Sequence, residues 1–178
     1  MQAERTEPAA ARAAFRFRDT VRQADAPAVQ NLVAETGFFN AAEIDLAEEL
    51  VVERLSKGSA SGYEFFIAEQ ASAFAGYVCY GAIAGTLASY DLYWIVVSPQ
   101  FQKQGLGRAL LSKAEQAIWR TGGRRVYVET SSRDQYAGTR AFYSSSGYKA
   151  QAVLEEFYAP GDHKMIFVKR LMTDHAQA

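Results

Sequence analysis

A short glycine-containing segment is the part of this sequence most suited to chemistry. It follows Pro99, between a predicted strand and a predicted helix, and reads Gln102-Lys103-Gln104-Gly105-Leu106-Gly107-Arg108. Glycine lacks a Cβ, so a ligand can approach the backbone closely. The first N–H groups of a helix have no partner within it and, with the helix dipole, form a site for phosphate or pyrophosphate. On these residues alone, a tight turn without a ligand is an equal alternative.

Two better-known phosphate motifs do not fit this segment. A P-loop requires Gly-Lys-Ser/Thr after a four-residue spacer, and the segment has no such run. The dinucleotide fingerprint Gly-x-Gly-x-x-Gly would need glycine at the position of Leu110. Lys103 and Arg108 still favour an anionic ligand, because both are cations.

The composition is typical of one ordinary globular domain. The chain has 178 residues, of which 49% are hydrophobic and 22% charged, and this excludes collagen-like, coiled-coil and wholly disordered chains. A net charge of −1 and a pI near 6.1 disfavour nucleic acid as a partner. The single cysteine, Cys79, cannot form an internal disulfide or a multi-cysteine zinc site, and it is predicted to lie in the core.

Nothing in the sequence predicts a membrane partner. No apolar run approaches the roughly 20 residues that span a bilayer, and the N-terminal residues have no apolar signal-peptide core. Together with the lone cysteine, this predicts a cytoplasmic protein. No metal site is predicted.

Periodicity and turn residues predict an α/β or α+β protein with a mixed sheet. Strands are expected at 15–18, 63–68, 74–80, 89–97, 126–130, 148–157 and 165–170. Helices are expected at 25–37, at 41–57, from Leu106 to the Gly122-Gly123 pair, and at 136–146. Asp25 is the predicted N-cap of the first helix, and Asn40 with Glu43 is a predicted capping box at the second. The domain spans 15–172, between a flexible tail over 1–14 and a C-terminal tail over 173–178.

Two signatures, in the expected order, resemble the GNAT superfamily of N-acetyltransferases. The strand Leu92–Pro99 with the segment Gln102–Leu111 is similar to the family's acetyl-CoA motif. The stretch Ala141–Tyr148 is similar to its second signature, an aromatic–tyrosine pair ahead of a glycine–aromatic pair. The element order fits over 15–172. The glutamine–glycine segment and the stretch Glu156–Pro160 are most similar to the ribosomal-protein-alanine acetyltransferase branch.

This resemblance implies a GNAT fold, with a mixed sheet of six or seven strands and about four flanking helices. The sheet would be splayed between the strands that end near Val97 and Val128. The resemblance also implies acetyl-CoA as co-substrate, with its pyrophosphate on the amides of Lys103 to Arg108. The strand residues implied to pair with the pantetheine arm are Ile95, Val96 and Val97. Further implied cofactor contacts are Thr139, Phe142 and Tyr136, the last at a position where the family often has asparagine.

The implied reaction needs two proton-transfer groups. An amine attacks a thioester only when it is neutral, so a general base must remove its proton, and the leaving thiolate benefits from an acid. The resemblance places Tyr143 at the family's proton donor, with a tyrosine that only packs its ring as the alternative. For the base the resemblance favours Glu129, with Asp91 or a chain of water molecules as alternatives.

The acceptor is predicted only as a primary amine, on a small molecule or at a peptide N-terminus. Its pocket is predicted to be lined by Phe38, Phe39, Tyr93 and Tyr158, with core aromatic residues as the equal alternative. His163 is expected in a solvated, turn-rich loop. The predicted reaction is direct attack in a ternary complex, and a non-catalytic acyl-CoA sensor is the alternative. A homodimer is the expected assembly, because dimers are the commonest oligomers of soluble proteins.

Overall fold

A single mixed sheet organises the protein. The computed structural model describes residues 14–172, so the tails predicted over 1–14 and 173–178 lie, apart from Ala14, outside the described residues. Seven strands are hydrogen-bonded in the order β1-β2-β3-β4-β5-β7-β6. Neighbouring strands are antiparallel except for β4 and β5, which run parallel. The predicted mixed sheet is therefore confirmed.

Every predicted element is present. The strands are β1 (Arg16–Arg18), β2 (Glu64–Gln70), β3 (Ala73–Ala82), β4 (Ser89–Val97), β5 (Arg125–Ser131), β6 (Lys149–Ala159) and β7 (Asp162–Arg170). The helices are α1 (Asp25–Glu35), α2 (Ala41–Lys57), α3 (Leu106–Arg120) and α4 (Ala137–Ser145), with 3₁₀ turns η1 (Gly58–Ser61), η2 (Pro99–Phe101) and η3 (Asp134–Tyr136). The capping box predicted for Asn40 and Glu43 is present at the start of α2. Within residues 14–172, no helix is both long and apolar enough to cross a membrane.

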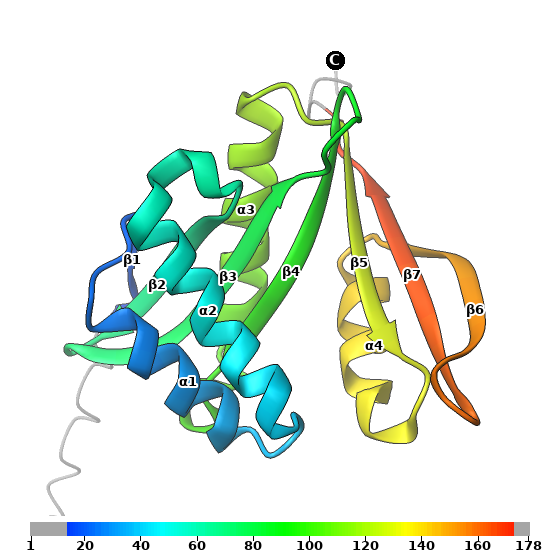
Figure 1. Ribbon diagram of the computed structural model, residues 1–178, viewed down its shortest axis with the longest axis horizontal. Coiled ribbons are helices and arrows are strands. Elements are labelled where there is room, and N and C mark those ends of the chain that lie inside the picture. The colour runs from blue at the N-terminus through cyan, green and yellow to red at the C-terminus, as the bar shows by residue number, and fades with distance from the viewer. Residues whose placement is uncertain (1–13, 173–178) are drawn as a thin grey trace, which may run out of the picture.

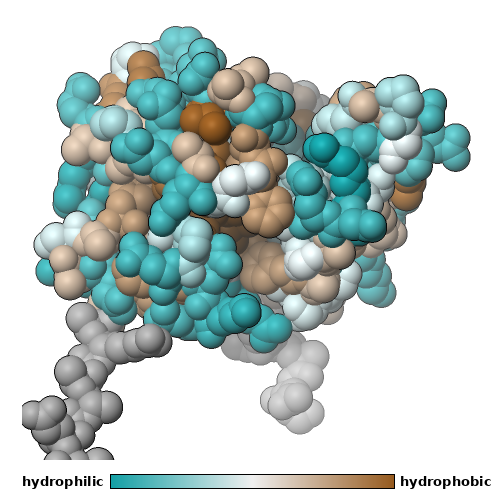
Figure 2. All heavy atoms as spheres, turned by 90° about the horizontal axis from the view of Figure 1, so that it is seen from below, coloured by the Kyte–Doolittle hydropathy of each residue, from teal (hydrophilic) through white to brown (hydrophobic). Residues whose placement is uncertain are grey.

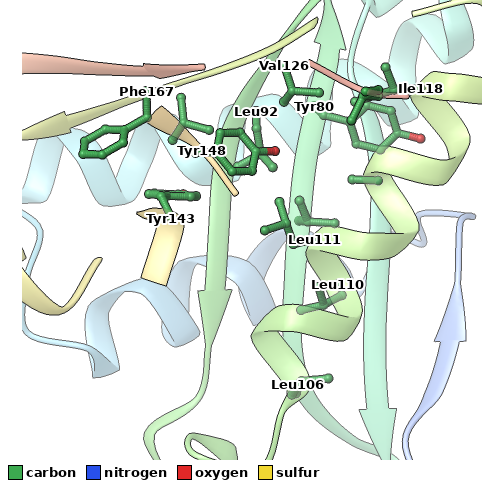
Figure 3. Packing of buried hydrophobic residues seen from close by; sticks show 14 of the residues in the cluster. Tyr80, Leu92, Leu106, Leu110, Leu111, Ile118, Val126, Tyr143, Tyr148 and Phe167 are labelled. Carbon is green, nitrogen blue, oxygen red and sulfur yellow. The ribbon is translucent and has the colours of Figure 1, made fainter. Parts of the chain in front are cut away.

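The helices cover both faces of the sheet (Figure 1). α1 and α2 pack on one face of β2, β3 and β4, in a core that includes Tyr77 and Cys79. α3 packs on the other face through Leu110 and Ile118, and α4 joins that side near β5 and β7 through Tyr143 (Figure 3). β3 serves both cores because successive residues of a strand point to opposite faces. Cys79 is fully buried, so its predicted core position is confirmed.

β4 and β5 separate after a short paired stretch. Only Ser89–Asp91 pairs with Arg125–Tyr127, and beyond these residues the two strands diverge toward the lower end of the molecule (Figure 1). The outer edge of each strand remains in the sheet, since β3 pairs with β4 and β7 with β5. The separation begins at a β-bulge, where Tyr93 has no partner opposite it in β3. A bulge increases local twist, which helps to turn β4 away, and the predicted splay is confirmed.

The first helix begins differently from the prediction. Its N-cap is Ala24, whose side chain forms no capping bond, and Asp25 lies in the first turn. Asp25 is only 3% exposed, and its carboxylate accepts the N–H of Arg22 at 2.6 Å and two bonds from the guanidinium of Arg18. The prediction of an Asp25 N-cap is wrong, because an arginine on β1 takes the carboxylate that would have capped the helix.

His163 lies in a strand rather than in the predicted loop. β7 begins at Asp162, so only residues 160–161 separate it from β6. His163 Nδ1 accepts the N–H of Glu156 at 2.9 Å, and the N–H of His163 donates to Ser132 Oγ at 2.9 Å. The first bond joins β7 to β6, and the second joins β7 to the residue that follows β5, so His163 is tied to both neighbouring strands. The loop prediction is therefore wrong.

A charged network fastens β1 to its neighbours. Arg18 bonds Asp25 on α1 at 2.5 Å and Glu69 on β2 at 2.9 Å. The side chains of Arg18 and Asp25 are 13% and 4% exposed. A buried charge is costly when unpaired, so this network fixes how the edge strand and α1 meet.

We expect Arg18→Met to lower the free energy of unfolding by about 3 kcal/mol, because it leaves the carboxylate of Asp25 buried without its ion pair. The measurement is urea denaturation at pH 7. Lys57→Met is the matched control, since it breaks an exposed pair with Glu53, and it should change stability by less than about 1 kcal/mol. Equal losses in the two variants would contradict the role given to the buried pair.

Candidate active site

The separation of β4 and β5 opens a cavity of about 710 Å³, which we call the splay cavity. From the open end of the splay, the surface is hollowed between the two halves of the molecule, and apolar residues gather around the hollow (Figure 2). The lining residues come from both halves of the sheet, from α2, η3 and α4, and from the β6–β7 hairpin. They are Phe39, Asn40, Glu43, Leu46, Leu50, Tyr63, Tyr93, Trp94, Ile95, Glu129, Thr130, Ser131, Arg133, Tyr136, Thr139, Tyr143, Tyr158, Ala159 and Asp162.

The cavity brings together many of the predicted site residues but not all of them. Those on its walls are Glu129, Tyr143, Ile95, Tyr136, Thr139, Phe39, Tyr93 and Tyr158. Those outside its lining are Asp91, Phe38, Val96, Val97, Phe142 and the segment Gln102–Arg108. Residues from distant parts of the chain thus meet at the splay. The glycine segment follows the end of β4 and lies outside the cavity lining.

The β-bulge explains why successive residues of β4 reach the cavity. In a regular strand neighbouring side chains point to opposite faces, but Tyr93 and Trp94 both line the splay cavity. Trp94 also contacts Phe39 from the segment before α2, with ring centroids 4.9 Å apart. Sequence reasoning missed Trp94, because strict alternation assigns it to the side opposite Tyr93.

Tyr143 is held at the cavity by packing. Its side chain is 4% exposed, and its ring lies 5.3, 5.6 and 6.2 Å from the rings of Phe142, Tyr148 and Phe167. Within residues 14–172 its hydroxyl forms no hydrogen bond. Burial raises the pKa of Tyr143 well above its ordinary value. The cavity therefore has a rigid, protonated phenol at its wall around neutral pH.

Glu129 lines the cavity from β5, just beyond the residues that pair with β4. Its Oε2 lies 2.6 Å from Nζ of Lys164, and the two side chains are 49% and 13% exposed. The ammonium of Lys164 also lies 3.7 Å from the ring centroid of Phe157, a cation–π contact that fixes the lysine. Sequence reasoning missed Lys164, because its position depends on the register that sets it opposite Ser131.

Asp91 lies at the apex of the splay, where β4 last pairs with β5. Burial raises the pKa of Asp91, the nearby charge of Glu129 raises it further, and Lys164 lowers it. Asp91, Glu129 and Lys164 therefore form one electrostatic cluster. Only Glu129 of these three lines the cavity, so it has the more direct access to a ligand there.

The glycine segment forms an open helix N-terminus. Gly105 is the N-cap of α3, has a φ of +80°, and provides no side-chain capping bond. A Cβ at Gly105 would meet nothing within 4 Å. The side-chain amide of Gln102 donates to the backbone carbonyl of Val97 at 3.2 Å, and that of Gln104 donates to the carbonyl of Gln100 at 3.0 Å. The side chains thus shape the turn and leave its backbone N–H groups for an anion.

The second half of the segment contacts α4. A Cβ at Gly107 would lie 3.5 Å from the ring of Phe142, and Arg108 donates to Ser145 Oγ at 3.3 Å. A further cavity of about 460 Å³ lies beside α3, and its lining includes Arg108 on α3, Ser145 on α4 and Lys169 on β7. The predicted anion site is therefore continuous with the helix that carries Tyr143.

Polar residues that the sequence did not indicate form the rim near η3. Asp162 is 5% exposed; it accepts from Ser131 Oγ at 2.5 Å and pairs with Arg133 at 3.0 Å. Tyr136 donates to the carbonyl of Phe38 at 3.5 Å, and their ring centroids are 6.0 Å apart. Tyr136 therefore closes the rim, and Phe38 supports it from outside the cavity. In residues 14–172, no three His, Cys, Asp or Glu side chains are grouped as metal ligands.

Comparison with known families identifies the class of protein. A model described as an acetyltransferase (GNAT) domain matches residues 61–150, which include the splay, the glycine segment and α4. A candidate acetyltransferase of the GNAT family from Desulfovibrio desulfuricans has 46% sequence identity and a TM-score of 0.87, over 88% of this chain and 99% of that one. The chain belongs to the GNAT acetyltransferase family. Comparison with curated proteins gives no match.

More distant structures share the fold. The ribosomal-protein-S18-alanine N-acetyltransferase of Escherichia coli has 19% identity and a TM-score of 0.71, over 93% of this chain and 99% of that one. The PaiA N-acetyltransferase of Thermoplasma acidophilum, solved in complex with coenzyme A, has 18% identity and a TM-score of 0.69, over 89% of this chain and 99% of that one. The family and fold predicted from the sequence are thus confirmed.

Proposed function

We propose that the protein transfers an acetyl group from acetyl-CoA to a primary amine by direct attack in a ternary complex. The main support is the meeting of Tyr143 and Glu129 in the splay cavity, close to the open N-terminus of α3. One group can donate a proton to a leaving thiolate, and the other can accept one from an ammonium. A cavity of about 710 Å³ has the size of a small-molecule site.

Acetyl-CoA fits the two unusual backbone features of the fold. Its pantetheine arm has amide groups, which can pair with the free edge of β4 at Ile95, Val96 and Val97 in the manner of an added strand. Its pyrophosphate can bind the N–H groups of the segment Lys103–Arg108. Thr139 and Phe142 on α4 would flank the thioester end. Proteins of this fold solved with coenzyme A or acetyl-CoA support acetyl-CoA as the co-substrate.

The proposed reaction uses the side chains as follows. Glu129, directly or through water, removes a proton from the acceptor ammonium. The neutral nitrogen attacks the thioester carbonyl, the C–N bond forms, and the C–S bond breaks. Tyr143 then gives its proton to the thiolate of CoA. An acetyl-cysteine intermediate has no support here, because Cys79 is fully buried in the core under α1 and α2.

Gly105→Asp tests the cofactor site. We expect the Kd for acetyl-CoA to rise at least tenfold, because a carboxylate in the turn repels the phosphates and fills the space beside the backbone. The measurement is titration calorimetry. Gly85→Asp is the matched control, since Gly85 has nearly the same φ (+77° against +80°) and equally open surroundings, but lies in the β3–β4 turn. Equal losses in the two variants, or none at Gly105, would contradict the assignment.

Tyr143→Phe tests the acid. We expect kcat to fall about 100-fold, a typical contribution of general acid catalysis, while the Kd for acetyl-CoA changes less than about twofold. The measurement is release of free CoA thiol. Tyr148→Phe is the control, because it removes a hydroxyl from the adjacent ring, 5.6 Å away, without altering the cavity lining. Acetyl-CoA binding with no turnover of any amine by the unmodified protein would indicate an acyl-CoA sensor instead.

Glu129→Gln and Asp91→Asn distinguish the two candidate bases. With Glu129 as the base, kcat/KM falls about 100-fold in the first variant and little in the second. With Asp91 as the base the order reverses. The acid limb of the pH profile would then move to lower pH in Glu129→Gln, because the charge of Glu129 raises the pKa of Asp91. The measurement is kcat/KM between pH 5 and 9.

A further inference from the structure

Aromatic rings arranged in pairs lie in and beside the lining of the splay cavity, and we call these pairs the aromatic wall. The pairs join segments that are mostly distant in sequence, with ring centroids 4.9 to 6.0 Å apart. They are Phe39 with Trp94, Tyr63 with Tyr93, Phe38 with Tyr136, and Phe157 with Tyr158. Six of these eight rings line the cavity. Because each ring is held by a partner, the wall is formed before any ligand binds.

Several rings of the wall are exposed to a degree that needs explanation. Phe38, Tyr93, Phe157 and Tyr158 are 44%, 40%, 53% and 48% exposed. Rings of this size normally lose most of their exposed surface on folding, and exposed apolar groups clustered at a cavity mark a binding site. Tyr93 and Tyr158 line the cavity itself, and Phe38 and Phe157 contact the lining rings of Tyr136 and Tyr158 from outside it. Exposed rings at and beside one cavity therefore indicate a ligand with an apolar, ring-sized body.

The charges of the cavity limit what else that ligand can carry. Two of its three lining carboxylates are in ion pairs, Glu129 with Lys164 and Asp162 with Arg133. The third, Glu43, accepts the N–H of Asn40 in the capping box of α2. Burial raises the pKa of Tyr93 and of Tyr158 to about 12, so these phenols are neutral at physiological pH. A ligand with several ammonium groups is favoured by several carboxylates without ion pairs, and among the cavity-lining residues only Glu43 is of that kind.

We propose that the acceptor is a small arylalkylamine, meaning one primary amine carried on an aromatic body. The proposal rests on the acetyl transfer proposed above. The ammonium enters toward Glu129, where a single proton has to be removed, and the ring stacks on the aromatic wall. Cation–π attraction to the rings also favours the protonated amine as it enters. Polyamines, aminoglycosides and peptide N-termini are the competing classes.

The test compares three primary amines that differ in aromaticity and in charge. They are 2-phenylethylamine, 2-cyclohexylethylamine, which has a similar shape but no aromatic ring, and 1,6-diaminohexane, which has two charges and no ring. We expect kcat/KM for 2-phenylethylamine to exceed that of each of the other two about tenfold, because its ring stacks on the aromatic wall and because two of the three lining carboxylates are already in ion pairs. A preference for the diamine, equal rates for all three, or faster acetylation of a peptide N-terminus would overturn the proposal.

Variants of two exposed rings locate the effect. Tyr93→Ala and Tyr158→Ala should lower kcat/KM for 2-phenylethylamine about tenfold, with a smaller change for the diamine and an unchanged Kd for acetyl-CoA. Tyr93→Phe and Tyr158→Phe are the matched controls, since they keep the ring, and they should retain the preference for the aromatic amine. Equal losses for all three amines in the alanine variants would also overturn the proposal.

A binding measurement separates this proposal from the proposed reaction. Calorimetry of each amine with the protein and CoA reports acceptor preference without requiring turnover. Selective binding of 2-phenylethylamine without acetylation would support the acceptor class and contradict the transfer reaction. Acetylation with no preference among the three amines would support the transfer reaction and contradict the acceptor class.

Discussion

The fold depends on a single interruption, the loss of pairing between β4 and β5 beyond Ser89–Asp91. Strand edges inside a protein are normally paired, because buried N–H and C=O groups without partners are costly. Here each strand keeps its outer neighbour, so the two halves of the sheet stay folded while their inner edges diverge. The gap is therefore a place where amide groups of a ligand can replace the missing strand pairing. The cofactor proposed for this protein has such groups in its pantetheine arm.

Two separate cores keep the gap open. One lies under α1 and α2 and is complete without β5, and the other joins α3 and α4 to the opposite face. In the second core the rings of Tyr143, Tyr148 and Phe167 pack together (Figure 3). Contacts of this kind contribute about 0.5–1.5 kcal/mol each beyond burial. The phenol proposed as the acid is thus positioned by core packing, which needs no hydrogen bond to its hydroxyl and leaves that group for the substrate.

The sequence predicts features that depend on neighbouring residues and misses those that depend on distant ones. The capping box at Asn40 and the turn at Gly105 were predicted because propensity and spacing determine them locally. The N-cap assigned to Asp25 is wrong because an arginine on another element competes for it. Trp94 and Lys164 were missed because a bulge and a strand register, which no local pattern encodes, bring them to the cavity. The fold is therefore more predictable from the sequence than the surroundings of the proposed catalytic groups.

In the proposed reaction, the apex of the splay links cofactor binding to the proton transfer. Asp91, Glu129 and Lys164 place two carboxylates beside one ammonium, so the cluster attracts a further cation. Such attraction is weak in water and stronger where water is excluded. In the proposed complex, acetyl-CoA fills the gap and dries the cavity, which strengthens the hold on the incoming ammonium at Glu129. Once the proton has moved to the carboxylate this attraction ends, and the neutral nitrogen is free to move toward the thioester. In this proposal, cofactor binding at the glycine segment and along β4 prepares the splay cavity for the acceptor.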